Sequence, residues 1–544
     1  MADLLPVRVP AIYSRKMNVN QHGNDVQIAD SEKFAYGTAG FRNHADKMTF
    51  IVYRCAYLAG LRARQQNKTI GLMITASHNP ACDNGVKLVD PNGDMLAMEW
   101  EKYATELVNA TDDQFPTAVR ALEVLINNPK AEDARVVCAI DTRESGPHLI
   151  KAAIAGAALF KVEFKNYGVC TTPQLHFMVK CSNEPKFGRA SDLGYYIHIA
   201  SAFRDLYNLT TEPTDSNYSN KLVLDCANGV GSPRFRDLLE LIDKSYLDVE
   251  FRNEYGELNS GCGADFVKIS KILPSNFTPA DEKCASFDGD ADRLIYFKPT
   301  TENSIELLDG DKIAVLLATY INEQLEDVDA DLTFGIIQTA YANGNSTRYI
   351  KEQLGVIVEI VPTGVKNLHN AALKYDIGVY FEANGHGTVV FSEKFDEVIR
   401  QQSSKNTAVQ RLQLFSHVIN EVVGDAFADL LAVEIVLRHY GWSIQDWNEK
   451  LYKDLPNVQI KVPVLDVSLF KTTWEETTLI TPDGFQDAIN EEVKKYPNSR
   501  AFVRPSGTES IVRVYAEADT EENAKDLGRY LESYARATSL SDLI

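Results

Sequence analysis

The chain has 544 residues, of which 44% are hydrophobic and 24% are charged. This length and composition predict a globular protein with three or four domains. A formal net charge of −21 argues against non-specific binding to nucleic acid or anionic membranes, because the field of the protein repels polyanions. Any substrate that carries phosphate must therefore meet local clusters of basic side chains and backbone N–H groups.

Neither secretion nor membrane insertion is expected from the sequence. The first thirty residues contain no basic lead followed by an apolar run, and no later apolar stretch approaches the length that spans a bilayer. The eight cysteines are scattered, without a C-x-x-C pair or metal-ligand spacing. We therefore expect reduced thiols and a cytoplasmic location.

The predicted elements alternate between helices and strands. An amphipathic helix is predicted over residues 48–66 and a short strand over residues 70–74, which ends in a polar loop. Helical patterns separate most of the later strand-like runs, which lie at residues 136–140, 222–224, 294–297, 332–337, 356–361 and 377–381. This alternation favours α/β units with mostly parallel sheets, whose functional loops lie at the carboxyl ends of strands.

Two further stretches indicate domain organisation. Residues 210–220 are polar and contain Pro213, which predicts a connection near the start of a second domain. A helix-rich region over residues 405–447 is followed by alternating residues at 458–467, and we interpret the remainder as a separate α+β domain. No exact internal repeat is visible, although three α/β blocks of similar size would fit a duplicated architecture.

Three carboxylates at alternate positions, Asp288, Asp290 and Asp292, follow an apolar run. Such carboxylates repel one another by about 3 kcal/mol per pair if ~5 Å apart at an effective dielectric near 20. A divalent cation removes this repulsion, and oxygen ligands suit Mg²⁺ or Ca²⁺. An EF-hand is excluded because its sixth loop position is Arg293 and its twelfth is Pro299. The structural alternative is a solvated acidic turn.

Ser77 lies in the polar loop at residues 75–80, and Lys87 follows it closely. The loop lacks the G-x-S-x-G elbow and oxyanion-hole glycines of a triad serine. A carrier of phosphate fits better, because charges that hold a phosphoserine near a metal also stabilise a transferring phosphoryl group. The alternative is a loop whose Ser and Asn only satisfy backbone groups.

Two later loops carry groups suited to a phosphosugar. Residues 504–509 read Arg-Pro-Ser-Gly-Thr-Glu, with Arg513 beyond, and an Arg fork, two hydroxyls and a flexible glycine can surround a phosphate. Residues 382–387 read Glu-Ala-Asn-Gly-His-Gly, where carboxylate and amide groups suit sugar hydroxyls. The alternatives are a turn with a surface arginine and a histidine that satisfies a backbone group.

Together and in this order, these segments resemble the α-D-phosphohexomutase superfamily over nearly the whole chain. Residues 37–42, Gly-Thr-Ala-Gly-Phe-Arg, also look like its G-T-x-G-x-R element. Within the superfamily the sequence is most similar to the eukaryotic phosphoacetylglucosamine mutases, because its sugar loop departs from the Gly-Glu-x-Ser-Gly-His of the glucose and mannose branches.

The resemblance implies an α/β fold with four domains in a heart shape around a central cleft. Three related α/β domains with mixed sheets would precede a C-terminal α+β domain. The domain boundaries that we predict are residues 1–190 for the phosphoserine domain, 191–300 for the metal-binding domain, 301–450 for the sugar-binding domain and 451–544 for the phosphate-binding domain.

The resemblance also assigns roles to residues at matching positions. Ser77 would be the phosphoserine and, with Asp288, Asp290 and Asp292, would bind one Mg²⁺. The groups near the transferring phosphate would be Arg42, His78, Lys87, Arg293 and His386. The substrate-binding residues would be Thr363, Gly364, Glu382, Asn384, Gly385, Arg504, Ser506, Gly507, Thr508 and Arg513.

The implied reaction is the interconversion of N-acetylglucosamine 6-phosphate and 1-phosphate, on the route to UDP-N-acetylglucosamine, through a 1,6-bisphosphate. Glucose or N-acetylglucosamine 1,6-bisphosphate would be the activator, and either Lys87 or a histidine would handle the hydroxyl proton. We expect a monomer that acts on a small phosphosugar and binds neither nucleic acid nor membrane. The alternatives are a phosphoglucomutase or phosphomannomutase, a metal-dependent sugar phosphatase and an inactive phosphosugar sensor.

Overall fold

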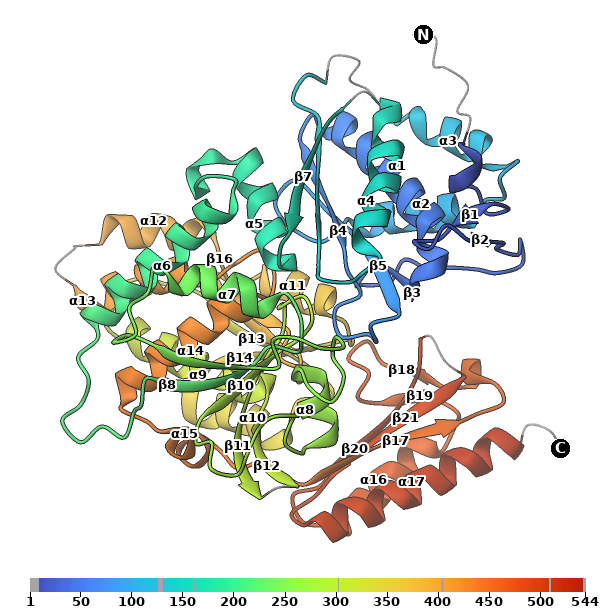
Figure 1. Cartoon of the computed structure of the whole chain (residues 1–544). Coiled ribbons are helices and arrows are strands. Elements are labelled where there is room, and N and C mark those ends of the chain that lie inside the picture. Colours follow the sequence, from blue (N-terminus) through green and yellow to red (C-terminus); the bar gives the residue numbers. More distant parts are fainter. Residues whose placement is uncertain are drawn as a thin grey trace. The chain divides into compact units, whose positions relative to one another are not determined.

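A computed structural model describes residues 9–125, 131–160, 162–301, 303–402, 406–507 and 510–541. The chain divides into two compact units, one of Met1–Asp309 with Gln413–Gly441 and one of Gly310–Leu412 with Trp442–Ile544 (Figure 1). No helix within the described ranges is long and apolar enough to cross a membrane. All eight cysteines are free thiols, as predicted.

The first sheet has five strands in the order β3-β5-β4-β6-β7. Its strands are β3 (Phe41–His44), β5 (Asp83–Val89), β4 (Thr69–Ile74), β6 (Arg135–Ile140) and β7 (Glu163–Val169). The central strand β4 is buried along its whole length, which explains its continuous apolar run. The predicted helix over residues 48–66 is confirmed as α1 (Met48–Gln66), and it packs against α4 (Gly146–Ala157). This stretch of the chain also contains α2 (Met98–Asn109), α3 (Phe115–Glu123), α5 (Thr172–Asn183) and α6 (Asp192–Leu209), of which α5 packs against β4.

The second sheet also has five strands, in the order β12-β11-β10-β8-β9. They are β12 (Ser304–Leu308), β11 (Leu294–Thr301), β10 (Cys284–Phe287), β8 (Lys221–Asp225) and β9 (Asp248–Arg252), with α7 (Gly231–Leu239) and α8 (Ala264–Ser270) between them in the chain. The polar connection predicted over residues 210–220 joins α6 to β8 and is confirmed. This unit also includes α14 (Ala426–Tyr440), which packs against α6.

The third sheet, in the other unit, has the order β14-β13-β15-β16. Its strands are β14 (Ile357–Val361), β13 (Phe334–Thr339), β15 (Ile377–Phe381) and β16 (Gly387–Phe391). The helices in this stretch of the chain are α9 (Gly310–Leu325), α10 (Gly344–Tyr349), α11 (Val365–Ala372) and α12 (Glu393–Gln401), and α13 (Thr407–Val418) and α15 (Ile444–Lys450) follow. Strands β13 and β15 are fully buried.

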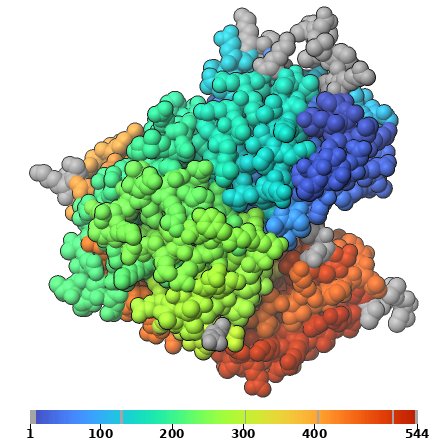
Figure 2. Space-filling model, in the orientation of Figure 1, coloured from blue at the N-terminus to red at the C-terminus, as the bar shows by residue number. Residues whose placement is uncertain are grey.

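The C-terminal part is the predicted α+β arrangement. Strands β17 (Asn457–Pro463), β21 (Ile511–Glu517) and β20 (Arg500–Pro505) form an antiparallel sheet. Helices α16 (Phe485–Val493) and α17 (Glu521–Ser541) accompany it, and β18 (Lys471–Thr472) pairs with β19 (Leu479–Thr481). The red residues of this part form one continuous surface in the space-filling view (Figure 2).

All three larger sheets are mixed, as the resemblance implied, whereas the alternation of elements alone favoured mostly parallel sheets. The cause is a hairpin in each sheet: β4 pairs antiparallel with β5, β10 with β11 and β15 with β16. Each hairpin begins with a strand that is paired in parallel on its other side. The three hairpin loops hold Ser77, the three aspartates and residues 382–386, so the predicted chemistry recurs at one topological position. This recurrence supports the duplicated architecture.

Candidate active site

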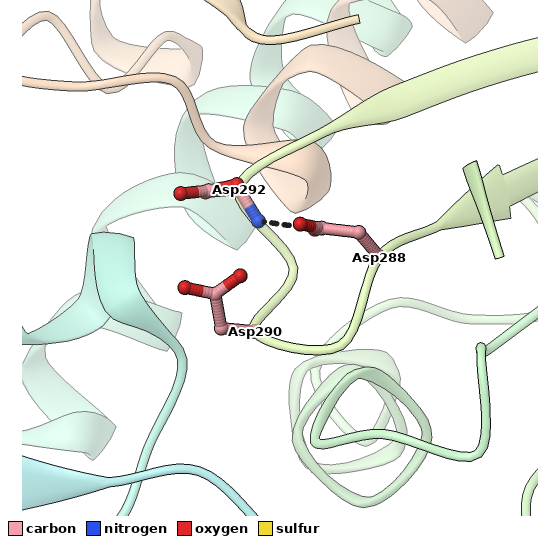
Figure 3. A group of neighbouring side chains, drawn as sticks. All are labelled: Asp288, Asp290 and Asp292. Carbon is pink, nitrogen blue, oxygen red and sulfur yellow. Dashed lines mark hydrogen bonds between the residues drawn. The ribbon is translucent and has the colours of Figure 1, made fainter. Parts of the chain in front are cut away.

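The loop between β10 and β11 gathers the three predicted metal ligands. One carboxylate oxygen from each of Asp288, Asp290 and Asp292 lies within 4.8 Å of the others, and all three residues are buried (Figure 3). Asp288 accepts hydrogen bonds from the backbone N–H groups of Asp292 at 3.0 Å and Arg293 at 3.2 Å. The loop therefore wraps around the Asp288 carboxylate.

The electrostatics of this cluster fit a divalent cation. Burial raises the pKa of Asp288 well above its usual range, and the Asp292 and Asp290 charges raise it further. The buried Oδ1 atom of Asp290 has no hydrogen-bond partner among the described residues. Buried carboxylates with unfilled acceptor capacity suit a hard cation such as Mg²⁺, and a solvated acidic turn is ruled out by their burial.

Ser77 lies directly against this cluster. Its Oγ donates to Asp288 Oδ2 at 2.6 Å, although 211 residues separate the two in the chain. The backbone N–H of Ser77 donates to Thr75 Oγ1, whose hydroxyl in turn donates to the buried Asp141. The serine hydroxyl is thus held beside the carboxylates, and the loop does more than satisfy its own backbone.

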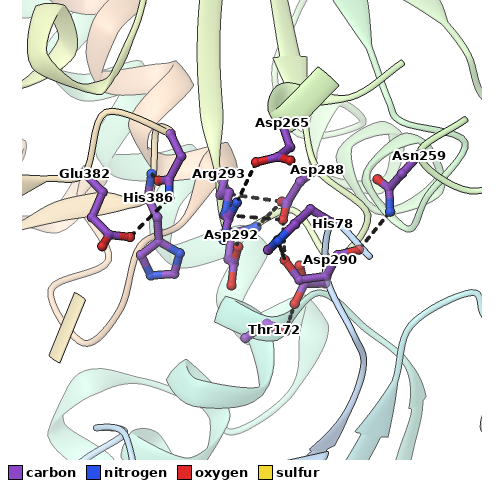
Figure 4. A network of polar contacts seen from close by, with 12 residues as sticks. His78, Thr172, Asn259, Asp265, Asp288, Asp290, Asp292, Arg293, Glu382 and His386 are labelled. Atoms are coloured by element: carbon purple, nitrogen blue, oxygen red, sulfur yellow. Dashed lines mark hydrogen bonds and ion pairs between the residues drawn. The ribbon is translucent and has the colours of Figure 1, made fainter. Parts of the chain in front are cut away.

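Lys87 and Arg293 supply positive charge at the carboxylates. The Lys87 ammonium lies 3.4 Å from Asp290 and 3.3 Å from Asp292. The Arg293 guanidinium lies 3.9 Å from both Asp288 and Asp292, and 3.3 Å from Asp265 (Figure 4). These cations offset part of the repulsion among the carboxylates and would face any phosphate carried by Ser77.

Arg42 and His78 complete the predicted group in this unit. Arg42 extends from β3 and donates to Asn79 in the serine loop at 3.3 Å, and burial followed by the Arg293 charge lowers the pKa of Arg42. The Nδ1 atom of His78 lies 3.4 Å from Ser77 Oγ. Burial, followed by the charges of Arg293 and Arg42, lowers the pKa of His78 to about 2, so its imidazole is neutral at working pH.

The predicted sugar loop forms a tight turn between β15 and β16. Gly385 has a φ of +87°, and its N–H donates to the carbonyl of Glu382. The Asn384 amide donates to the Glu382 carboxylate at 3.2 Å and accepts from the backbone N–H of His386 at 3.0 Å. These contacts bring the four predicted residues together and fix the turn, while His386 is buried.

The predicted phosphate loop begins on β20, where Arg504 lies directly opposite Arg513 of β21. Like charges at such cross-strand positions repel each other, so this pair suits a bound anion. The N–H of the buried Ser506 donates to the Ile511 carbonyl at 3.0 Å. The φ of Gly507 is not positive, so its backbone conformation does not require glycine. Thr508 lies outside the described residues.

Glu476, which the sequence did not single out, connects two predicted substrate-binding positions. It lies in the turn between β18 and β19, and its carboxylate forms an ion pair with Arg504 at 3.0 Å. The same carboxylate accepts from the backbone N–H of Thr363 at 2.9 Å and from its hydroxyl at 2.8 Å. Gly364 follows with a φ of +126°, a conformation open mainly to glycine. Nothing local in the sequence links Glu476 to these residues.

Thr172 is a second residue that sequence reasoning missed. Its hydroxyl donates to Asp290 Oδ2 at 2.6 Å, and its N–H donates to the Asp290 carbonyl (Figure 4). It is the first residue of α5, whose N-terminus carries a capping box made by Thr171 and Gln174. The capping signal is readable in the sequence, but its proximity to the aspartates is not.

Comparisons with known proteins settle the family. A relative from Candida albicans named phosphoacetylglucosamine mutase is 44% identical over 520 residues, which cover 91% of this chain and 95% of that protein. The chain belongs to the phosphoacetylglucosamine mutase family. Models of phosphoacetylglucosamine mutase AMG1 domains II and III match residues 187–295 and 309–442. Models of the phosphoglucomutase/phosphomannomutase α/β/α domain I and C-terminal domain match residues 58–115 with 107–187, and 470–530.

Solved structures agree with this family membership. A crystal structure of an N-acetylglucosamine-phosphate mutase of the α-D-phosphohexomutase superfamily, in its substrate complex, is 42% identical with a TM-score of 0.88. The match covers 93% of this chain and 97% of the chain in that structure. The Aspergillus fumigatus N-acetylphosphoglucosamine mutase in complex with GlcNAc-6P and magnesium is 40% identical with a TM-score of 0.87. That match covers 98% of this chain and 100% of the Aspergillus chain. The phosphohexomutase fold predicted from the motifs is confirmed.

Proposed function

We propose that this chain interconverts N-acetylglucosamine 6-phosphate and N-acetylglucosamine 1-phosphate, in the synthesis of UDP-N-acetylglucosamine. The observation that carries the proposal is the 2.6 Å hydrogen bond from Ser77 Oγ to Asp288, inside a cluster of three buried carboxylates. A serine in this position can carry a phosphoryl group next to a cation. Relatives named phosphoacetylglucosamine mutase support the sugar.

The transfer conserves the phosphoryl group at every step. In the first half-reaction the bond between Ser77 Oγ and phosphorus breaks while a sugar hydroxyl oxygen bonds to phosphorus, and the hydroxyl proton passes to a base of the site. The product is the 1,6-bisphosphate, which turns around in the site. Its other phosphoryl group then returns to Ser77 Oγ, and the released sugar oxygen regains a proton.

The groups around Ser77 have distinct tasks in this mechanism. Asp288, Asp290 and Asp292, with Ser77, would hold Mg²⁺, which supplies neutralisation of charge on the transferring phosphoryl oxygens. Lys87 and Arg293 place further positive charge there, as does Arg42. The two candidates for the base are His78, whose neutral imidazole can accept a proton, and Lys87, which can accept one only after its ammonium has given up a proton and with it the positive charge.

The other unit would bind the parts of the substrate that do not react. Glu382, Asn384 and Gly385 would contact the sugar, with His386 near the transferring phosphate. Arg504, Ser506, Gly507, Thr508 and Arg513 would hold the second phosphate, and Thr363 with Gly364 would contribute to substrate binding. A 1,6-bisphosphate is the proposed activator, and the Aspergillus fumigatus enzyme has a crystal structure in complex with glucose 1,6-bisphosphate. One chain supplies every one of these groups, so we propose a monomer, and its free thiols favour the cytoplasm.

A substrate panel tests the proposed function directly. The purified chain, with Mg²⁺ and a trace of glucose 1,6-bisphosphate, should convert N-acetylglucosamine 6-phosphate with a higher kcat/KM than glucose 6-phosphate or mannose 6-phosphate. Formation of the 1-phosphate is followed by a coupled assay and inorganic phosphate is measured in parallel. Preference for glucose or mannose phosphate would reassign the enzyme, and release of inorganic phosphate without an isomer would make it a phosphatase.

Glu476→Gln should lower the KM for N-acetylglucosamine 6-phosphate. The Glu476 carboxylate occupies Arg504 and the Thr363 donors, so an incoming phosphate must compete with it. A hydrogen bond to a charged group is worth about 2 kcal/mol, so a fall in KM of about thirtyfold is the upper expectation. The neighbouring, exposed Glu475 offers a matched control, because Glu475→Gln removes the same charge from the adjacent position. A raised KM in Glu476→Gln would mean that the carboxylate organises this site instead.

A further inference from the structure

The backbone at Ser77 adopts a conformation that serine rarely takes. Its φ is +50°, in the left-handed region that disfavours residues with a Cβ. Ser77 is fully buried. The backbone of Gly289 packs closely against it, since a Cβ placed on Gly289 would lie 2.6 Å from the Ser77 carbonyl oxygen. Surrounding contacts must hold such a conformation in place.

Arg143 is one source of these contacts. Arg143 follows β6 in the chain. Its side chain is fully buried and forms an ion pair with Asp141 at 3.0 Å. The guanidinium donates to four carbonyl oxygens, those of Ser77 (2.9 Å), Asn79 (2.9 Å) and Pro80 (2.6 Å) in the serine loop and that of Asp83 (2.7 Å) at the start of β5. A planar fork of donors is the group best suited to fix several carbonyls at once.

Asn259 is the second source, and it comes from the part of the chain that carries the aspartate loop. It lies between β9 and α8, and its amide donates to the Ser77 carbonyl at 2.9 Å and to the Asn79 carbonyl at 3.0 Å. Figure 4 shows Asn259 in the same polar network as His78 and Asp288. Arg143 therefore binds the two carbonyls from the side of the first sheet, and Asn259 binds the same two from the side of the second.

The geometry assigns to Asn259 and Arg143 the role of positioning residues that aim the Ser77 hydroxyl at the metal-binding carboxylates. Both side chains donate to the carbonyl oxygen of Ser77, so each acts through the backbone. The two donors hold the carbonyl of Ser77, and the Oγ of the same residue donates to Asp288 at 2.6 Å. Fixing the backbone of Ser77 therefore also fixes the direction of its hydroxyl. Loss of either donor frees the peptide to relax from its left-handed conformation and turns the hydroxyl away. This inference rests on the proposed phosphoserine mechanism.

The test is the rate at which Ser77 becomes phosphorylated. The full-length chain is incubated with Mg²⁺ and glucose 1,6-bisphosphate, and intact mass together with peptide mapping follows the label over time. Asn259→Ala should slow labelling and lower kcat by about ten- to hundredfold, while the KM for the sugar phosphate and the Tm stay near those of the unsubstituted chain. Asn259→Asp, which keeps the shape but replaces the amide donor by an acceptor, should slow labelling at least as much.

Asn220 provides a matched control. Its amide also donates to two backbone carbonyls, those of Lys244 and Ser245, and it is partly buried like Asn259. Asn220→Ala should label at the unsubstituted rate. If Asn259→Ala were labelled as fast as the unsubstituted chain, the positioning role would be overturned and the phosphoserine mechanism would stand. The same holds if Asn220→Ala slowed labelling as much as Asn259→Ala does. No labelling of the unsubstituted chain would overturn the phosphoserine mechanism and this inference with it.

Discussion

Ser77→Ala is expected to abolish turnover and phosphorylation together. The Ser77 oxygen forms the covalent bond to phosphorus in both half-reactions, so its removal leaves no carrier. Loss of a covalent nucleophile costs about 10⁴-fold or more in kcat in comparable enzymes. The fold should survive, because Asp288 keeps its two backbone donors from Asp292 and Arg293. Steady-state kinetics, intact mass and thermal unfolding measure the three quantities on one preparation.

Ser201→Ala is the control for this change. Ser201 lies on α6, and its hydroxyl donates to the backbone carbonyls of Ile197 and His198 within that helix. It should keep full activity and the phosphate label. Undiminished turnover in Ser77→Ala would end the phosphoserine mechanism. A label that persists in Ser77→Ala would place the phosphate on another residue.

The sequence predicted the elements of the site well where a motif and a strand end coincide. Ser77 follows the strand predicted over residues 70–74, and the sequence indicates a loop at the end of that strand. For the aspartates the sequence shows only a preceding apolar run, which the structure identifies as the buried strand β10. The strands themselves were found because their apolar runs are continuous. The sequence does not predict the hairpin partners β5 and β16, because Lys87 and the glycines interrupt their apolar patterns. Without these antiparallel strands, the sequence overestimates the parallel content of the sheets.

Contacts between distant segments could not be predicted from single residues. Thr172, Asn259 and Glu476 have no motif of their own, and each gains its place from a partner far away in the chain. Arg143 follows a predicted strand, but a buried arginine that fixes four carbonyls looks, in sequence, like a surface cation. Residues that position other residues are therefore the part of the site that needs coordinates. The four-domain boundaries remain a prediction.

Asp290→Asn is expected to remove the response of the protein to Mg²⁺. The substitution keeps an acceptor for the Thr172 hydroxyl but deletes one of three carboxylate charges from the cluster. In the unsubstituted chain Mg²⁺ at 100 times its Kd should add about 2.7 kcal/mol to the free energy of unfolding. The variant should show no such gain. Its kcat should fall by about 10³-fold, since cation stabilisation of the transferring group is worth several kcal/mol.

The stability of the variant without metal separates a metal ligand from a structural carboxylate. Burial and mutual repulsion raise the pKa of Asp288, so the cluster opposes folding until a proton or a cation neutralises it. With EDTA present, Asp290→Asn should therefore unfold at a Tm no lower than that of the unsubstituted chain. Asp265→Asn, which deletes a nearby carboxylate outside the cluster, should keep the Mg²⁺-induced rise in Tm. A large loss of Tm in EDTA, with the Mg²⁺ response intact, would mean that Asp290 stabilises the fold through Thr172 and Lys87 rather than binding the cation.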